Sequence, residues 1–416
     1  MPSTGFSATN HELECDGVSL AAIADRVGTP IYVYSAALIR ARFQDIDGAF
    51  RGYPHTLHYA LKANSTFAIA SVLKSLGSAA DANSIWEIDL ARRVGFEPKD
   101  IVFTGVGKSQ AELECAVPLG LKAINVESAG ELQRIEAIAT HLGRAARVAV
   151  RVNPDIDAKS HPHISTGLKV NKFGVDLGAA RSLLASLAAR PLLKLVAVHV
   201  HIGSQITTLA PLQRAARFIA DLTVDLQHAG VALEYVDVGG GLGISYDGAE
   251  IVSPHDYVTA VVEEVRPTGL PIVIEPGRSI VGPAGVLVAR VIDIKPRTAA
   301  TDFVVIDAGM TELMRPALYN AYHRIEAVHP RDQPRRQYEI VGPVCESSDV
   351  VGRDRMLPPL AVGDLVAIQD AGAYGSAMAS NYNRRPFPAE VIVDGGQWRV
   401  IRRRQTIDDM LSLETP

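Results

Sequence analysis

The chain has 416 residues, of which 47% are hydrophobic, so it is long enough to form two domains with substantial cores. Its 41 basic and 46 acidic residues give a net charge of −5, with both signs scattered along the chain and no long basic run. This pattern argues against a nucleic-acid partner or an anionic membrane surface. We therefore expect the partner to be a small molecule or a second copy of the chain.

The first residues, MPSTGFSATNHELECDG, contain no basic segment followed by an apolar core, and no later run approaches the roughly 18 apolar residues of a membrane-spanning helix. We therefore expect a cytoplasmic protein without membrane contact. Cys15, Cys115 and Cys345 are too few and too far apart for a disulfide framework or a CxxC metal site. No metal is expected.

A helix is predicted to begin after Ser35, because a serine hydroxyl suits the N-cap position. Ile39, Phe43, Ile46 and Phe50 follow at spacings of four, three and four residues. These spacings place the four apolar side chains on one face of a helix.

Eight strand-like runs follow this helix, and the segments between them, such as 131–143 and 211–230, are long enough for crossover helices. Eight β-then-α units predict an α/β fold of the (β/α)8 TIM-barrel type, and an open doubly wound sheet is the alternative. The strands are expected at residues 56–61, 78–82, 100–105, 122–126, 147–152, 194–202, 235–238 and 271–275.

After about residue 282 the alternation of strand-like and helix-like segments gives way to short β-like runs separated by Gly, Pro and Asp turns. This pattern predicts a mostly β second domain, formed by residues 282–416 together with residues 1–34. Within the amino-terminal part, IYVYS is a candidate additional strand of that domain. Residues 35–281 are assigned to the barrel.

The active site of such a barrel lies at the carboxyl ends of its strands. Lys62 follows the first strand in HYALKAN, although a lysine at this position more often covers apolar surface with its stem and leaves its ammonium group in water. His199 and His201 in HVHIGSQ share one face of the sixth strand, where a hydrogen-bonded core pair is the alternative interpretation.

Two further loops indicate an anion site at the same end. Gly239, Gly240 and Gly241 in DVGGGLG are expected to leave backbone N–H groups free to approach an anion, although such a run is often only a flexible turn. EPGRSIV brings Glu275, Gly277 and Arg278, and the loops after strands seven and eight of a barrel commonly bind phosphate.

A lysine beside a phosphate site predicts pyridoxal 5′-phosphate, whose aldehyde forms a Schiff base with Lys62. Glu275 would face the nitrogen of the cofactor ring and favour its protonation, and His201 would offer a flat imidazole to stack on the ring.

In these residues the chain resembles the fold-type III pyridoxal-phosphate decarboxylases, and most closely the diaminopimelate decarboxylases among them. The motifs that carry the resemblance are specific in combination and span almost the whole chain. They are YALKAN (59–64), HISTGLKVNKFG (163–174), HVHIGSQ (199–205), GGGLG (239–243), EPGRSIV (275–281), DAGMTELMRPALY (307–319), GPVCESSD (342–349) and DAGAYGSAM (370–378).

The resemblance implies a role for each matching residue. Lys62 would carry the cofactor, and Cys345 would return a proton to the decarboxylated carbon. The other cofactor-binding residues would be Asp81, His201, Ser204, Gly239, Gly240, Gly241, Glu275, Gly277, Arg278 and Tyr374. The substrate would be bound by Arg278, Arg315 and Tyr319 at its far carboxylate, by Glu346 at its far amine, and by Tyr374. In this family Cys345 and Glu346 enter the site from the second subunit, so the resemblance implies a homodimer.

The implied activity is decarboxylation of meso-2,6-diaminopimelate to L-lysine, the last step of bacterial-type lysine biosynthesis. Alternatives are a decarboxylase of ornithine, arginine or another basic amino acid, a non-catalytic pyridoxal-phosphate protein, and a cofactor-free Schiff-base aldolase. Cys345 could instead be an inert buried thiol, and Arg315 with Tyr319 a surface pair. The chain also departs from the family where an SGGE-like turn is usual, because it carries Ile85 and Trp86 in place of the two glycines.

Overall fold

The computed structural model describes residues 5–9, 12–158, 166–167, 171–297 and 301–415. The chain divides into two compact units. The barrel unit comprises Phe43–Ile244 and Glu250–Ser279, and the β unit comprises Met1–Arg42, Ser245–Ala249 and Ile280–Pro416. Within the described residues, no helix is long and apolar enough to cross a membrane.

Eight parallel strands close into a ring in the barrel unit, which confirms the predicted (β/α)8 fold. Each strand pairs with the next along the chain, and β13 pairs back with β5. This closure excludes the open doubly wound sheet. The strands are β5 (His55–Ala60), β6 (Ala79–Ala82), β7 (Ile101–Phe103), β8 (Ala123–Val126), β9 (Ala146–Asn153), β11 (Leu193–His199), β12 (Tyr235–Asp237) and β13 (Ile272–Ile274), and a short β10 (Val175–Asp176) pairs with β9.

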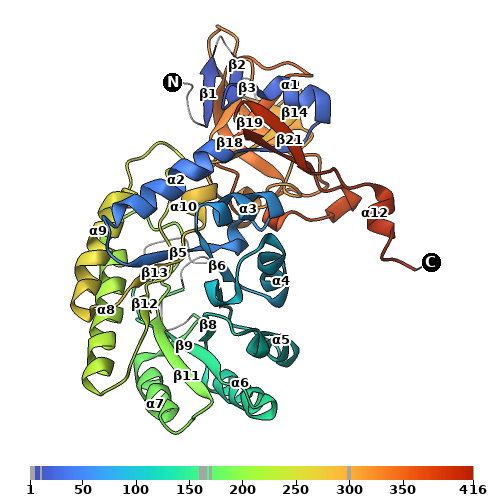
Figure 1. Cartoon of the computed structure of the whole chain (residues 1–416). Coiled ribbons are helices and arrows are strands. Elements are labelled where there is room, and N and C mark those ends of the chain that lie inside the picture. Colours follow the sequence, from blue (N-terminus) through green and yellow to red (C-terminus); the bar gives the residue numbers. More distant parts are fainter. Residues whose placement is uncertain (1–4, 10–11, 159–165, 168–170, 298–300, 416) are drawn as a thin grey trace. The chain divides into compact units, whose positions relative to one another are not determined.

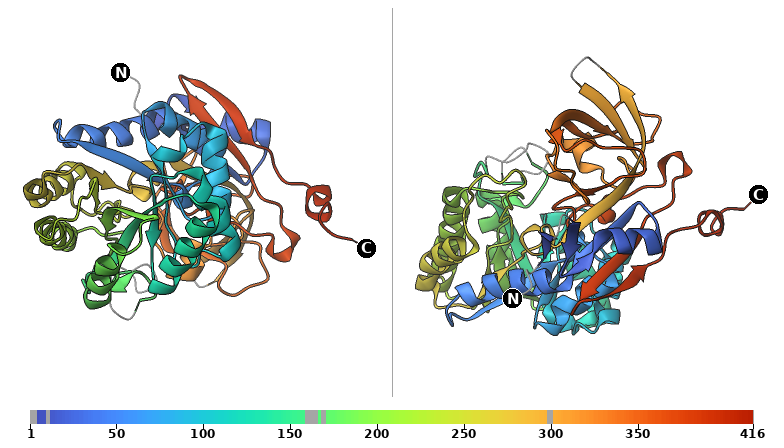
Figure 2. Two further views of the ribbon diagram at one scale, coloured as in Figure 1. Left: turned by 60° about the horizontal axis from the view of Figure 1, so that its bottom comes forward. Right: turned by 90° about the horizontal axis from the view of Figure 1, so that it is seen from above.

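Helices lie on the outside of these strands (Figures 1 and 2). They are α2 (Ala36–Ala49), α3 (Phe67–Ser75), α4 (Ile85–Val94), α5 (Gln110–Ala116), α6 (Ala129–Leu142), α7 (Leu177–Leu187), α8 (Leu209–His228) and α9 (Pro254–Val265). Ser35 caps α2 as predicted, because its Oγ accepts a hydrogen bond of 2.9 Å from the Leu38 N–H. The predicted apolar face of α2 is buried at Ile39, Phe43, Ile46 and Phe50.

Most side chains of the barrel strands are buried, which is why the strands read as apolar runs rather than alternating patterns. One apolar cluster in the unit comprises Ala123, Ala149, Val196, Ala197, Tyr235 and Val273. The barrel strands and the positions directly after them also carry buried polar side chains at His58, Asp81, Asn125, His199, Asp237 and Glu275. Such groups are costly to bury without partners, so they mark where function constrains the fold.

The β unit contains two sheets and confirms the prediction of a mostly β second domain. In the larger sheet, β4 (Ile31–Ser35) pairs antiparallel with β14 (Gly285–Pro296) and parallel with β20 (Ala389–Asp394), so IYVYS is the additional strand expected from the sequence. The other strands of this sheet are β15 (Thr301–Ile306), β16 (Ile325–Ala327), β17 (Arg336–Val341), β18 (Val350–Leu357), β19 (Leu365–Ile368) and β21 (Gln397–Arg402).

The smaller sheet of the β unit comprises β1 (Phe6–Thr9), β2 (Glu12–Cys15) and β3 (Val18–Ser19). Its core is continuous with that of the larger sheet, because Leu13 and Cys15 of β2 belong to one buried cluster with Val33, Val286 and Val391. The helices are α1 (Leu20–Val27), α11 (Arg315–Tyr319) and α12 (Ile407–Leu411), and the single turn α10 (Arg278–Val281) begins in the barrel unit and ends in the β unit.

Candidate active site

Lys62 lies in a 3-10 turn (Leu61–Ala63) directly after β5, at the carboxyl end of the barrel strands as predicted. Its Nζ is 3.5 Å from Oδ2 of Asp81, which is fully buried, whereas the Lys62 side chain is 32% exposed. Asp81 is opposite Ala60 in the register of β6 and β5, so the pairing of two neighbouring strands brings lysine and carboxylate together. Burial and the negative charge of Glu275 raise the pKa of Asp81, and Lys62 opposes this shift.

His201 is held in one orientation by the glycine loop. The Gly240 N–H donates a hydrogen bond of 3.0 Å to Nδ1 of His201, so Nδ1 carries no proton and the ring proton is on Nε2. The pKa of His201 is well below its usual value because the ring is desolvated and Lys62 and Arg151 are positively charged. The imidazole is therefore neutral.

The three glycines after β12 are required by close approach of other loops. A Cβ on Gly239 would lie 2.3 Å from the carbonyl oxygen of Val200, and one on Gly240 would lie 2.2 Å from that of Glu275. The Gly239 N–H donates to Oδ1 of Asp237 at 2.9 Å, and the Gly240 N–H donates to His201. The expectation that these N–H groups are free is therefore wrong for Gly239 and Gly240, because neighbouring buried acceptors take both.

Backbone hydrogen bonds join the loop after β13 to its neighbours. The Glu275 N–H donates to Gly239 O at 2.8 Å, and the Ala60 N–H donates to Pro276 O at 3.1 Å. Arg278 is buried, and its Nη2 donates a hydrogen bond of 3.0 Å to Oγ of Ser204. A cation and a hydroxyl from two different loops thus lie side by side at the rim, as suits an anion site.

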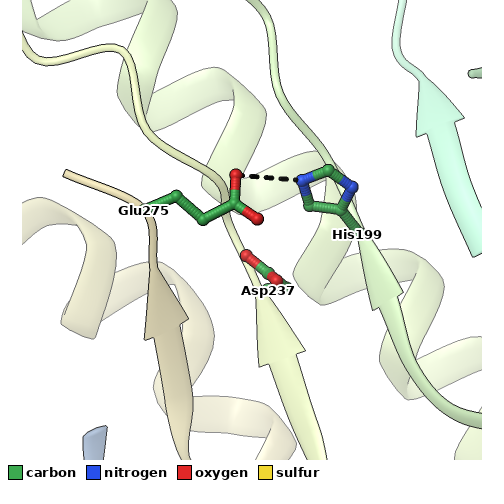
Figure 3. Close-up of side chains that lie close together, drawn as sticks. All are labelled: His199, Asp237 and Glu275. Carbon is green, nitrogen blue, oxygen red and sulfur yellow. Dashed lines mark ion pairs between the residues drawn. The ribbon is translucent and has the colours of Figure 1, made fainter. Parts of the chain in front are cut away.

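Glu275 belongs to a group of buried ionisable side chains that sequence reasoning recognised only in part. His199 Nε2 is 3.4 Å from Glu275 Oε2, and Asp237 lies beside both (Figure 3). Burial by itself raises the pKa of Glu275, but the positive charges of His199 and Lys62 outweigh it, so the pKa lies well below its usual value. Asp237 was not among the predicted site residues, although an aspartate in the otherwise apolar run before GGG was the available signal.

Together the sites predicted in the barrel unit converge on one end of the strands. Lys62, Asp81, His201, Ser204, the three glycines, Glu275, Gly277 and Arg278 all lie on the final residues of strands or on the loops that follow them. Of the motif HISTGLKVNKFG, residues 163–165 and 168–170 lie outside the described residues.

In the β unit, Arg315 begins helix α11 and is 4% exposed, which contradicts the alternative of a surface pair with Tyr319. Arg315 Nη1 donates to His323 Nε2 at 2.7 Å, and His323 Nδ1 donates to Gln369 O at 2.8 Å. The guanidinium also lies 4.6 Å from the ring centre of Tyr246. Arg315 is therefore oriented on two sides, and Tyr319 is half-buried on the same helix.

Cys345 and Glu346 lie in the loop between β17 and β18, and both are exposed on the single chain. The alternative of an inert buried thiol at position 345 is therefore wrong. The Cys345 N–H donates to Asn383 Oδ1 at 3.1 Å, and the Tyr382 hydroxyl donates to Glu346 Oε2 at 3.2 Å. Tyr374 is half-buried and adopts a left-handed backbone with φ of 55°, a conformation uncommon for a tyrosine.

Trp86 belongs to the turn in which the sequence departs from the SGGE-like pattern of the family. It is 74% exposed at the start of α4, so its indole does not fill the barrel interior. The turn is a regular helix start, because Ser84 Oγ accepts from the Glu87 N–H. Glu87 Oε2 accepts a 2.7 Å hydrogen bond from the Asn83 N–H, and burial raises the pKa of Glu87 to about 7. Ile85 and Trp86 therefore stand in the first turn of a regular helix, and Glu87 in the same turn keeps its hydrogen bond to the Asn83 N–H.

Comparison with known proteins places these features in a family. Residues 36–282 match the model of the pyridoxal-dependent decarboxylase family, pyridoxal binding domain. The diaminopimelate decarboxylase of Pseudomonas aeruginosa is 44% identical to the chain, over 99% of the chain and 98% of that protein. The crystal structure of diaminopimelate decarboxylase from Helicobacter pylori complexed with L-lysine has 43% identity and a TM-score of 0.91, over 94% of the chain and 98% of its own. The corresponding lysine co-complex from M. jannaschii has 37% identity and a TM-score of 0.94, with coverages of 99% and 98%.

Proposed function

Because this chain belongs to the pyridoxal-dependent decarboxylase family, and within it to the diaminopimelate decarboxylases, we propose that it converts meso-2,6-diaminopimelate to L-lysine and CO₂. This reaction is the last step of bacterial-type lysine biosynthesis. The observation that carries the proposal is the 44% identity over 99% of the chain, which includes both the barrel unit and the β unit.

The residues at the carboxyl end of the barrel fit pyridoxal 5′-phosphate. Oε1 of Glu275 is buried and accepts no hydrogen bond from the described residues, so an acceptor is available for a protonated ring nitrogen. Lys62 supplies an amine 3.5 Å from Asp81, and Ser204, whose Oγ accepts a hydrogen bond from Arg278, supplies a hydroxyl donor for a phosphate. Pyridoxal phosphate, when bound, links to the substrate amine and accepts the electron pair that CO₂ leaves behind.

Each barrel residue then has a physical task. Asp81 orients the Lys62 ammonium group, and Glu275 as a carboxylate favours a proton on the ring nitrogen. His201 is neutral, so its ring face can lie against a positively charged heterocycle without adding a second positive charge.

We further propose for this chain the contacts to the substrate's far end that the family resemblance implies. Arg278, Arg315 and Tyr319 would bind its far carboxylate, Glu346 its far amine, and Tyr374 the cofactor and substrate together. Burial supports this role for Arg315, because an arginine that is already ordered loses little side-chain entropy on binding an anion.

The same proposal includes a homodimer in which the partner subunit supplies Cys345 and Glu346. Its support is the exposure of both residues on the single chain, since a proton donor to a reacting carbon works best in a water-excluded site. We also propose a cytoplasmic location, because the exposed free thiol of Cys115 suits a reducing compartment.

The test is release of CO₂ from a panel of diamino acids by purified protein loaded with pyridoxal phosphate. Meso-diaminopimelate should be decarboxylated, whereas the LL and DD isomers, ornithine and arginine should react slowly or not at all. Equal turnover of ornithine or arginine would contradict the substrate while leaving the cofactor assignment intact.

A further inference from the structure

Three neighbouring strands of the barrel bring three ionisable side chains into one buried group. His199 ends β11 and Asp237 ends β12, where the two residues are direct partners in the parallel register. Glu275 follows β13 by one residue. His199 and Asp237 have no exposed surface, and Glu275 is 3% exposed. One ligand atom from each side chain lies within 4.8 Å of the other two, and Figure 3 shows the three side chains converging.

Two carboxylates in so small a buried space pose an electrostatic problem. Each negative charge loses hydration on burial, and each repels the other, so in the absence of a cation at least one of the pair would keep its proton. A protonated Glu275 could not favour a proton on the cofactor's ring nitrogen. A positive charge next to Glu275 would leave that carboxylate ionised and the proton on Asp237.

His199 is the side chain placed to supply that charge. Its Nε2 is 3.4 Å from Glu275 Oε2. The other ionisable groups near Glu275 include Lys62 and His201 on the neighbouring loops, Asp81 on β6 and the neutral His58 on β5. Since His201 accepts the Gly240 N–H and is neutral, and Lys62 is to be joined to the cofactor, neither provides a permanent cation.

The remaining contacts agree with a protonated His199 beside an ionised Glu275. Burial and the positive charge of Arg151, which pairs with His199 in the register of β9 and β11, lower the pKa of His199, but the charge of Glu275 outweighs them and the pKa is raised. Burial and the charge of Glu275 raise the pKa of Asp237 well above its usual value. Asp237 Oδ1 also accepts the Gly239 N–H, which ties this carboxyl group to the glycine loop.

We propose that His199 is a positioning residue for the decarboxylation, an imidazolium between Glu275 and Asp237 that keeps Glu275 ionised with Oε1 directed to the cofactor's ring nitrogen. This inference rests on the proposed cofactor chemistry, but not on which amino acid is the substrate. Asp237 is the competing carboxylate whose proton affinity His199 also controls.

The test removes the positive charge of residue 199 while keeping a side chain that can donate a hydrogen bond. His199→Gln places a neutral amide where Nε2 lies 3.4 Å from Glu275 Oε2, whereas the matched control His58→Gln removes another fully buried histidine of the barrel. His58 is neutral in the native protein, because burial and the charge of Lys122 lower its pKa to about 3. Each variant is loaded with ¹⁵N-labelled pyridoxal phosphate, and the ring-nitrogen resonance is followed by NMR against pH.

We expect His199→Gln to weaken proton binding at the ring nitrogen at least tenfold and His58→Gln to change it less than threefold. The double variant His199→Gln/Asp237→Asn should recover most of the loss, because without the second carboxylate Glu275 ionises unaided. A purely structural role for His199 predicts no such recovery, and that result would overturn the proposal, as would an unchanged resonance in His199→Gln.

Two further measurements complete the test. If His199→Gln fails to fold, Asp237→Asn alone must keep the ring nitrogen protonated at least as strongly as the wild type, and a weaker proton affinity refutes the charge argument. A stoichiometric metal ion in purified wild-type protein that is lost in His199→Gln would also overturn it, because these three side chains would then be metal ligands. Failure to decarboxylate meso-diaminopimelate would contradict the proposed substrate but leave the ring-nitrogen result to be judged separately.

Discussion

Replacing Arg315 tests the proposed substrate most directly. In the structure the Arg315 guanidinium is buried, and its Nη1 donates a hydrogen bond of 2.7 Å to His323 Nε2. The guanidinium carbon also lies 4.6 Å from the ring centre of Tyr246. Because the side chain is already ordered, binding a carboxylate costs it little further conformational entropy. Charge-assisted hydrogen bonds of this kind contribute about 1.5–3 kcal/mol each.

Arg315→Ala should therefore lose about 3 kcal/mol of transition-state binding, which lowers kcat/KM for meso-diaminopimelate roughly 10²-fold. His323→Ala removes the bond that orients Arg315 without removing its charge, so we expect a loss of roughly tenfold, which corresponds to about 1.4 kcal/mol. Arg353→Ala is the matched control, because Arg353 is an exposed arginine of β18 and should leave kcat/KM unchanged.

The assay is steady-state CO₂ release, with the visible absorbance of bound cofactor recorded for each variant. Absorbance should be the same in all three variants and the wild type, since Arg315 acts on the substrate in this proposal. A kcat/KM for Arg315→Ala within twofold of wild type, with normal folding and cofactor content, would refute the assignment of the far carboxylate to this arginine. Substrates without a far carboxylate, such as lysine and ornithine, should be poorer by roughly 10⁴-fold, because they leave buried donors unpaired.

Three further predictions follow from the same structure. Lys62→Ala should abolish both turnover and the visible absorbance of bound cofactor, and borohydride treatment of the wild type should label Lys62, so a label on another lysine would contradict the assignment. Dimers re-formed from a mixture of inactive Lys62→Ala and Cys345→Ala proteins should regain activity, and no recovery after verified subunit exchange would argue against a shared site. Glu87 has a pKa of about 7 in the folded state against a usual value of 4.5, so its contribution to stability is complete below pH 4.5 and is lost as the pH rises through 7. Denaturant unfolding of cofactor-free protein should therefore show the wild type losing roughly 1–3 kcal/mol relative to Glu87→Gln between pH 4.5 and pH 8, and parallel pH profiles would show that Glu87 is not perturbed.

Local side-chain patterning was enough to predict the architecture. The spacing of Ile39, Phe43, Ile46 and Phe50 predicted a helix because burial on one face requires that period, and eight apolar runs predicted eight barrel strands. The carboxyl ends of those strands then predicted where Lys62, His201 and Glu275 lie, because a parallel barrel brings all its strand ends to one rim.

What the pattern could not predict were the partners of buried polar groups. The sequence left open whether His199 was a core histidine and did not single out Asp237, yet the register of β11, β12 and β13 places both beside Glu275. Likewise the N–H groups of Gly239 and Gly240 look free in the sequence, but the folded chain directs them to buried acceptors.

The contacts of Arg315 were equally hidden from the sequence pattern, because Tyr246 lies 69 positions earlier in the chain and nothing local links the two. Apolar periodicity depends on neighbours within a few residues, so the amino-acid sequence alone determines the elements and their order. The protonation state and orientation of a buried ionisable group depend on charges a few ångströms away in space, and only the closed barrel and the paired strands decide which charges those are.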